Sequence, residues 1–193
     1  MNACLLAWLI LFSAAPPAVE RTFTRTADLT GDGTPQRVVI TINGASWNQP
    51  FAWSVSVQDG AVEIFRHSQT DTRIDGFFRD TGFVEGCSGY RACKEQYYFH
   101  DLPSRVVTQL RPPESTNILD KAAPNGVWVV ARKDLLKCCT QDRVALDRAV
   151  EDLAAFIRSG RAWVLEIPIS PAQSDPPLAW SSVFKKFVRV YQD

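Results

Sequence analysis

The sequence predicts an α+β protein: an antiparallel β meander followed by a mixed helix/strand half, pinned by disulfides. Three observations lead to this prediction. Apolar and polar residues alternate through much of the first third of the chain, one amphipathic helical pattern occupies residues 140–161, and four cysteines lie beyond residue 80. The alternation is typical of strands with one buried face, and the helical pattern comes after the strands rather than between them.

The meander begins with two predicted strands. Residues 22–26 are rich in β-forming side chains, and apolar residues alternate with more polar ones at residues 38–42. Between them lies a short segment rich in Asp, Gly and Thr, which predicts a tight connection.

A β-hairpin is the clearest local prediction. Residues 51–66, FAWSVSVQDGAVEIFR, alternate on both sides of Asp59-Gly60, which favours a type I′ turn. A two-residue turn at this place would pair Val57 with Val62 and would put the apolar residues of both strands on one face.

The amphipathic pattern at residues 140–161 predicts the one long helix. Its apolar stripe consists of Leu146, Ala149, Val150, Leu153, Ala154 and Ile157. The spacing of these residues matches one face of an α-helix. Thr140 is predicted to cap the start of the helix, and Gly160 to close its end.

Three further segments complete the second half. Residues 126–132 and 162–169 are predicted strands. Residues 179–193 carry a helical stripe, although their last part also alternates, and we expect a short helix that gives way to an extended end.

The middle of the chain, residues 75–103, shows no clean period, and we expect a long excursion pinned by a disulfide. Its aromatic residues are Phe77, Phe78, Phe83, Tyr90, Tyr97, Tyr98 and Phe99, and its cations include Arg79, Arg91 and Lys94. This composition fits either a binding surface or a satellite core under a long loop, and we favour the core.

The N-terminal segment is predicted to be a signal peptide. An apolar run from Cys4 to Phe12 precedes small residues and is too short to cross a membrane as a helix. The predicted organisation is therefore a signal peptide at residues 1–18 and a single α+β domain at residues 19–193. We expect a periplasmic or secreted protein with no stable membrane span after cleavage.

The cysteines support export. Without Cys4, four remain, namely Cys87, Cys93, Cys138 and Cys139, and an even set in an exported chain predicts two disulfides. Three connectivities are open. A bond between the neighbours Cys138 and Cys139 would close a strained ring, so we expect each to bond to one of the other two.

Composition and motifs argue against several functions. Acidic and basic residues balance at 21 each, so we expect no nucleic-acid partner. The sequence has no G-x-S-x-G elbow, and its two histidines, His67 and His100, have no zinc-like spacing. Cys87 is the one candidate nucleophile, and a disulfide is the better interpretation of it. No catalytic residue is therefore assigned.

The segment ADLTGDGTPQ, residues 27–36, is the candidate metal site. Asp28, Thr30 and Asp32 stand at alternate positions and Gly33 follows, which is the rhythm of a chain that curls around a calcium ion. This segment resembles the short calcium loop of FG-GAP (VCBS) repeats and dockerin-type segments.

The resemblance covers about a dozen residues and implies calcium as the cofactor. It implies side-chain ligands at Asp28, Thr30 and Asp32 and a main-chain ligand at Thr34. Gln36 stands where the family has a further acid. Two carboxylates predict a weak site, and a solvated turn in which both aspartates bond their own backbone is the alternative.

Taken together, the sequence predicts an exported, non-catalytic envelope or secreted protein with one weak structural calcium loop. Two alternatives stay open: an exported enzyme, either a hydrolase or a thiol-disulfide protein that uses Cys138 and Cys139, and a binding module that uses the aromatic segment 77–99. The sequence assigns no partner.

Overall fold

The structure is a computed structural model that describes residues 18–81, 83–84, 87–110, 128–130, 132–170 and 173–192. It confirms the α+β class, with two antiparallel sheets and helices packed against each. The predicted signal peptide, apart from Ala18, lies outside the described residues.

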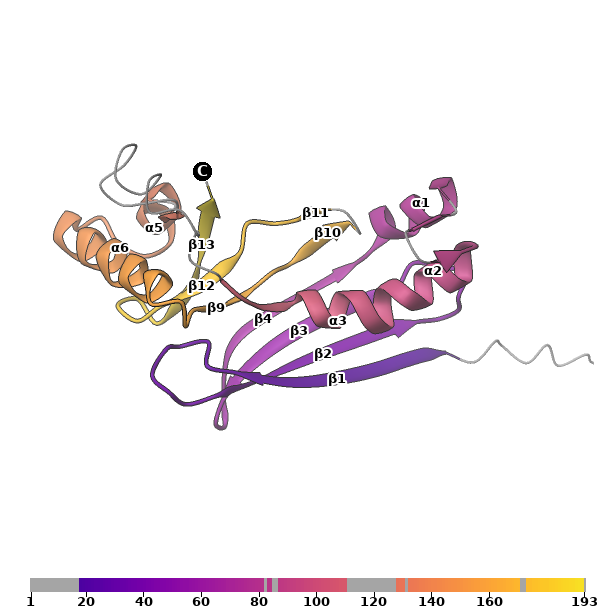
Figure 1. Cartoon of the computed structure of the whole chain (residues 1–193), viewed down its shortest axis with the longest axis horizontal. Coiled ribbons are helices and arrows are strands. Elements are labelled where there is room, and N and C mark those ends of the chain that lie inside the picture. Colours follow the sequence, from indigo (N-terminus) through magenta and orange to yellow (C-terminus); the bar gives the residue numbers. More distant parts are fainter. Residues whose placement is uncertain are drawn as a thin grey trace, which may run out of the picture.

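The first sheet is the predicted meander, with its strands in the order β1-β2-β3-β4 (Figure 1). The four strands are β1 (Val19–Ala27), β2 (Gln36–Gly44), β3 (Ala52–Asp59) and β4 (Val62–Thr70). The β1–β2 register runs without a shift from Val19 opposite Gly44 to Ala27 opposite Gln36. Sequence neighbours pair throughout, so this sheet forms from local contacts.

The alternation in β2 and β3 gives the sheet its two faces. Val38, Ile40 and Ile42 are fully buried, and they lie opposite Val57, Val55 and Trp53 of β3. The residues between them point to the other face and are exposed or half-buried. Burying side chains of this size contributes about 1.5–3 kcal/mol each, which fixes the register because a one-residue slip would expose them all.

The hairpin between β3 and β4 exists, but its predicted register was wrong. Asp59 pairs with Val62, so the turn residues are Gly60 and Ala61. A type I′ turn needs positive φ at both central residues, and of these two Gly60 alone has it, at 58°. A register shift next to Val57 then places Phe65 opposite it, where we had expected Val62.

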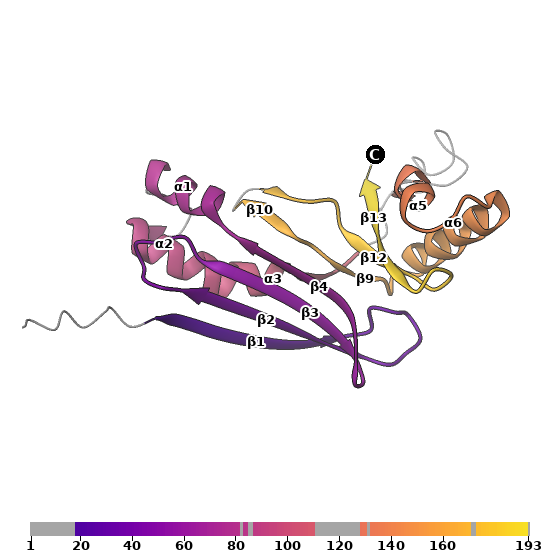
Figure 2. The same ribbon diagram turned by 180° about the vertical axis from the view of Figure 1, so that it is seen from behind.

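Helices cover the buried face of the first sheet (Figures 1 and 2). They are α1 (Thr72–Thr81), α2 (Tyr90–Gln96), the π-helical turn η1 (Tyr97–Asp101) and α3 (Leu102–Arg105), and a small β5–β6 ladder (Phe83–Val84 with Cys87–Ser88) joins α1 to α2.

The expected irregular excursion is therefore mostly helical. Its buried positions, Cys93, Tyr97, Tyr98 and Leu102, do follow a helical spacing. The sequence does not show this pattern clearly, because one of the buried positions is occupied by a charged residue, Lys94.

The second sheet has the order β7-β9-β12-β13-β8. Its strands are β7 (Val107–Gln109), β9 (Trp163–Leu165), β12 (Leu178–Ser181), β13 (Lys186–Gln192) and β8 (Trp128–Val130), with a β10–β11 ladder (Pro168–Ser170 with Gln173–Ser174) beside it. Helices α5 (Arg132–Cys138) and α6 (Arg143–Arg158) lie beside this sheet in Figure 1, and α6 buries its predicted apolar stripe in the second core.

The ends of α6 match the prediction at one side only. Gly160 closes the helix with φ 69°, as expected. At the start the cap is Asp142 instead of Thr140, because the Asp142 side chain accepts a hydrogen bond from Val144 N at 2.9 Å. Thr140 instead accepts a hydrogen bond from Asp142 N.

The C-terminal segment is a β-hairpin, and the expected short helix is wrong. Trp180 in β12 pairs with Phe187 in β13, and their ring centroids lie 5.2 Å apart. Lys185 has φ 52° in the turn between them. The alternation in the last residues was the correct signal, and the sheet edge offered by β9 is what favours it over the helix.

Several contacts join the two halves, among them the hydrogen bond that Gln69 Nε2 donates to the Pro168 carbonyl at 3.2 Å, and two of them involve aromatic rings. Phe65 of β4 packs against Phe187 of β13, with ring centroids 5.2 Å apart. The loop between β1 and β2 reaches α6, where Gly31 lies so close to Phe156 that a Cβ atom would overlap the ring.

We predict opposite effects for two glycine-to-alanine substitutions. At Gly44 a Cβ atom would overlap the ring of fully buried Phe51, so Gly44→Ala should destabilise the protein by about 1–3 kcal/mol through overpacking. At Gly76, inside α1, a Cβ atom meets open space, so Gly76→Ala should stabilise it by about 0.5–1 kcal/mol. Urea unfolding measures both, and equal effects of one sign would contradict this packing.

Candidate functional site

The Asp-Gly loop closes on itself through its own side chains. Asp28 accepts hydrogen bonds from Gly31 N at 2.8 Å through Oδ1 and from Gly33 N at 3.0 Å through Oδ2. Asp32 accepts one from Thr34 N at 2.8 Å, and this bond is the main reason that its pKa lies below the ordinary value. Gly31 and Gly33 both have positive φ, which this tight path requires.

Gln36 holds the base of the loop. Its Oε1 accepts hydrogen bonds from Leu29 N at 2.8 Å and Thr30 N at 3.2 Å, and its Nε2 donates to Thr30 Oγ1 at 3.0 Å. Gln36 is fully buried, and both lone pairs of Oε1 are used. The Gln36 side chain therefore ties the start of β2 to the segment that follows β1. Its Oε1 atom is not free to bind an ion in this arrangement.

The remaining candidate ligands keep part of their hydrogen-bonding capacity. Each carboxylate oxygen of Asp28 accepts one hydrogen bond and keeps a lone pair, and one Asp32 oxygen does the same. Thr30 Oγ1 and the Thr34 carbonyl are neutral oxygen atoms of the kind that calcium takes as ligands. Across the described residues, however, no three His, Cys, Asp or Glu side chains gather closely enough to hold a metal ion.

A second cluster surrounds the ammonium group of Lys94, which is fully buried. Lys94 Nζ donates to Asp75 Oδ1 at 2.8 Å, to Tyr90 OH at 3.1 Å and to the carbonyl oxygen of Trp47 at 3.1 Å, and it also donates to the carbonyl oxygen of Gln49. The centroid of the Phe51 ring lies 4.1 Å from the same nitrogen. Three N–H groups thus meet four oxygen acceptors, and an aromatic face adds a cation–π contact.

Asp75 is the counter-ion of this cluster. It also accepts a hydrogen bond from Arg79 Nε at 2.8 Å and one from the Tyr90 hydroxyl. Burial alone would raise the pKa of Asp75, but the hydrogen bonds from Lys94, Tyr90 and Arg79 hold it below the ordinary value of 3.8. The carboxylate therefore stabilises the fold above about pH 4, and this contribution is lost as the pH falls through its folded-state pKa.

The other two groups respond to the same environment. Burial lowers the pKa of Lys94, and the Asp75 carboxylate opposes that change. With four oxygens around Nζ, the charged ammonium is the form that the site fits. Burial and the hydrogen bond to Asp75 raise the pKa of Tyr90 to about 12, so its phenol stays neutral. Lys94, Asp75 and Tyr90 all have hydrogen-bond partners within the cluster, and such an arrangement suits a structural role.

The aromatic segment contributes mainly to the core. Phe78, Tyr97 and Tyr98 are buried completely or nearly so, and Phe77, Tyr90 and Phe99 are partly buried against them. The hydroxyl groups of Tyr97 and Tyr98 have no hydrogen-bond partner within the described part of the chain, and burial raises the pKa of both. The side chain of Phe83 lies outside the described residues.

A third polar contact ties β3 to the start of α1. Trp53 Nε1 donates to buried Asp71 Oδ2 at 3.0 Å, and Asp71 N donates to the Phe51 carbonyl at 2.8 Å. His67 packs on Trp53 with ring centroids 5.5 Å apart, and its Nε2 lies 3.2 Å from Gln69 Oε1. The sequence did not single out Asp71, and it placed Lys94 only among the cations of the aromatic segment, because nothing local shows that a lone charged residue will be buried.

The four cysteines form two disulfides, but the expected crosswise pairing is wrong. Cys87 bonds to Cys93, and Cys138 bonds to Cys139. The first pair forms because β6 leads directly into α2, so six residues of separation leave the two Cα atoms 5.3 Å apart. Helices α2 and α5 pack on different cores, which separates the partners that we had expected.

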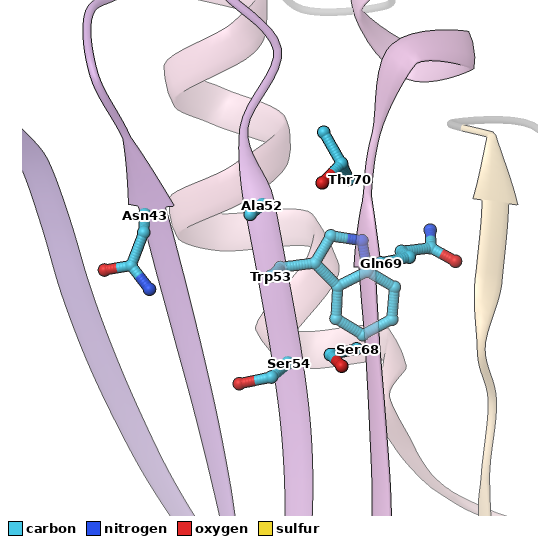
Figure 3. Close-up of a pocket in the computed structure, with 7 residues that line it drawn as sticks. All are labelled: Asn43, Ala52, Trp53, Ser54, Ser68, Gln69 and Thr70. Atoms are coloured by element: carbon cyan, nitrogen blue, oxygen red, sulfur yellow. The ribbon is translucent and has the colours of Figure 1, made fainter.

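The open face of the first sheet carries a shallow depression of about 430 Å³ (Figure 3). It is lined by Asn43, Ala52, Trp53, Ser54, Ser68, Gln69 and Thr70, from β2, β3 and β4. The side chains of Asn43, Ser54, Ser68 and Thr70 can exchange hydrogen bonds with a neutral ligand, whereas Trp53 Nε1 already donates to Asp71. None of them titrates near neutral pH, so the depression does not offer acid–base chemistry.

Comparison of the chain with protein-family models, with curated proteins and with solved structures finds no match. The roles of the Asp-Gly loop and of the Lys94 cluster therefore follow from their own geometry. Within the described ranges, no helix has the length and apolar character that a membrane crossing needs.

We predict that Lys94→Met destabilises the protein by about 3–5 kcal/mol, because it removes the buried charge partner of Asp75 and leaves the carbonyl oxygens of Trp47 and Gln49 without their donor. The matched control is Lys137→Met, since Lys137 is exposed and its loss should cost less than about 0.5 kcal/mol. Urea unfolding of both variants gives the comparison. Similar stabilities would show that the Lys94 cluster does not hold the fold together.

Proposed function

We propose that this protein is an exported, non-catalytic protein of the periplasm or the extracellular space, in which the Asp-Gly loop is a structural element with weak affinity for calcium. The observation that carries the proposal is the pairing of all four cysteines beyond the N-terminal segment. Disulfides persist in oxidising compartments and are rare in a reducing cytosol. The apolar N-terminal run supplies a route to such a compartment.

The use made of the buried ionisable groups supports a non-catalytic role. Lys94, Asp75 and Tyr90 bond to one another and to the backbone, so their polar atoms serve the fold. Cys87 is held in a disulfide and presents no thiolate, and His100 is exposed on η1. A hydrolase or a binding module based on the aromatic segment would need groups that are free to meet a substrate.

Export is tested by expressing the full chain in a Gram-negative bacterium. We expect a periplasmic product that has lost the first 15–18 residues, identified by intact mass and N-terminal sequencing. The control is Leu9→Arg, which places a charge inside the apolar run and should leave the chain unprocessed in the cytosol. A wild-type chain that keeps Met1 and stays in the cytosol would overturn the export proposal.

Calcium binding is tested by melting the mature protein with calcium or with chelator. A dissociation constant of about 10⁻⁴ to 10⁻³ M is expected for a site of this kind. At a tenfold excess of calcium over that constant, binding adds about 1.4 kcal/mol, or about 3–5 °C in melting temperature. Magnesium should not reproduce the shift, because it prefers tighter octahedral sites.

Two variants separate ion binding from general stability. Asp32→Ala should abolish the calcium shift. Asp142→Ala also removes an aspartate that accepts a backbone hydrogen bond, but it lies at the start of α6 and should keep the shift. If the wild type melts at one temperature with calcium and with chelator, the loop is a self-bonded turn without an ion.

A further inference from the structure

The two disulfides lie in different surroundings. Cys93 is fully buried in the first core, next to Lys94, and its partner Cys87 is partly buried against that core. Cys138 is exposed at the end of α5, and Cys139 is half-buried against the second core. One pair is therefore protected by the fold, and the other presents a sulfur atom to solvent.

The two disulfides also differ in what they can do for stability. A cross-link stabilises a protein mainly by restricting the unfolded chain, and the effect grows with the length of the loop that it closes. Cys87 and Cys93 enclose a loop, whereas Cys138 and Cys139 are already joined by a peptide bond. The bond between neighbours removes little freedom from the unfolded chain, so it contributes little to the stability of the fold.

Hydrogen bonds hold the turn between α5 and α6 in addition to the bond between the two sulfur atoms. Cys139 N and Thr140 N both donate to the Leu135 carbonyl, at 3.0 and 3.3 Å, and Gln141 Nε2 donates to the Leu136 carbonyl at 3.0 Å. Cys138 Sγ lies 3.9 Å from the Leu135 carbonyl oxygen, which can accept a hydrogen bond from a thiol at that place. Both the oxidised and the reduced pair thus fit the same turn.

We propose that Cys138–Cys139 is a thiol–disulfide exchange site, which a dithiol reduces and which the disulfide form of such a dithiol re-forms by the reverse steps while the protein stays folded. A thiolate of the dithiol attacks exposed Cys138 Sγ, a mixed disulfide forms, and Cys139 leaves as a thiolate and takes a proton from water. The second thiolate of the reductant then attacks its own sulfur in the mixed disulfide and releases Cys138. Two electrons pass to this protein, and the reductant becomes a disulfide.

The assignment goes beyond the role in export and does not depend on calcium. Its substrate class is a dithiol, either a small molecule or a protein with two neighbouring cysteines. Access selects Cys138 as the attacked sulfur, since exchange requires the thiolate to reach it in line with the bond. Cys87–Cys93 has one sulfur in the core, so it should exchange only when the first half opens.

The test is a titration of the full chain, purified without reductant, with dithiothreitol. Free thiols are trapped with iodoacetamide at each step and assigned by peptide mass spectrometry, and far-UV circular dichroism reports folding. We expect Cys138 and Cys139 to be labelled at about tenfold lower reductant than Cys87 and Cys93, with an unchanged spectrum. Reduction of both pairs together, or reduction of the neighbours only as the spectrum is lost, would overturn the proposal.

Single substitutions test the attacked sulfur directly. Cys139→Ser leaves Cys138 as a free thiol, and Cys138→Ser leaves Cys139. The first variant should react with a maleimide about tenfold faster than the second, because exposure controls access to the thiol. Equal rates, or a faster Cys139, would contradict the order of steps. Since each variant changes one exposed or half-buried atom, both should keep the wild-type spectrum.

Discussion

A buried ammonium group has to be surrounded by oxygen atoms, and in this protein that requirement organises the first half of the molecule. The donors of Lys94 reach the segment after β2, the first helix and its own helix α2 at once. Lys94 follows Cys93, so the disulfide and the ion pair fix the same turn of α2. Leaving any partner unpaired would cost more than the pair itself contributes, and the segments are therefore held together as a unit.

The elements that the sequence predicted well are those set by side-chain period. The alternation in β2 and β3 and the apolar stripe of α6 each bury residues on one face, so period and burial agree. The type I′ turn failed because Asp59 joined the strand instead of taking positive φ. The sequence of the C-terminal hairpin carries both the helical period and the strand period. Pairing of β12 with β9 and of β13 with β8 favours the strands, and neither pairing can be predicted from the local sequence.

The candidate site was predictable only as far as local chemistry extends. The turn-forming bonds of Asp28 and Asp32 follow from their spacing to Gly31, Gly33 and Thr34. The hydrogen bonds from Leu29 N and Thr30 N to the Gln36 carboxamide do not follow from local spacing, because they need the register of β1 on β2. The cysteine pairing depends on which core each helix joins, and four cysteines alone leave three connectivities open.

The close approach of Gly31 to Phe156 means that each half limits the residues that the other can accept. Position 31 is restricted to glycine for two separate reasons, its positive φ and the ring beside it. A smaller residue at position 156 would remove the steric reason and leave the backbone reason in place. Substitutions at these two positions are therefore coupled only in part: a smaller residue at 156 would relieve the overlap with a side chain at 31, and the positive φ would keep that side chain costly.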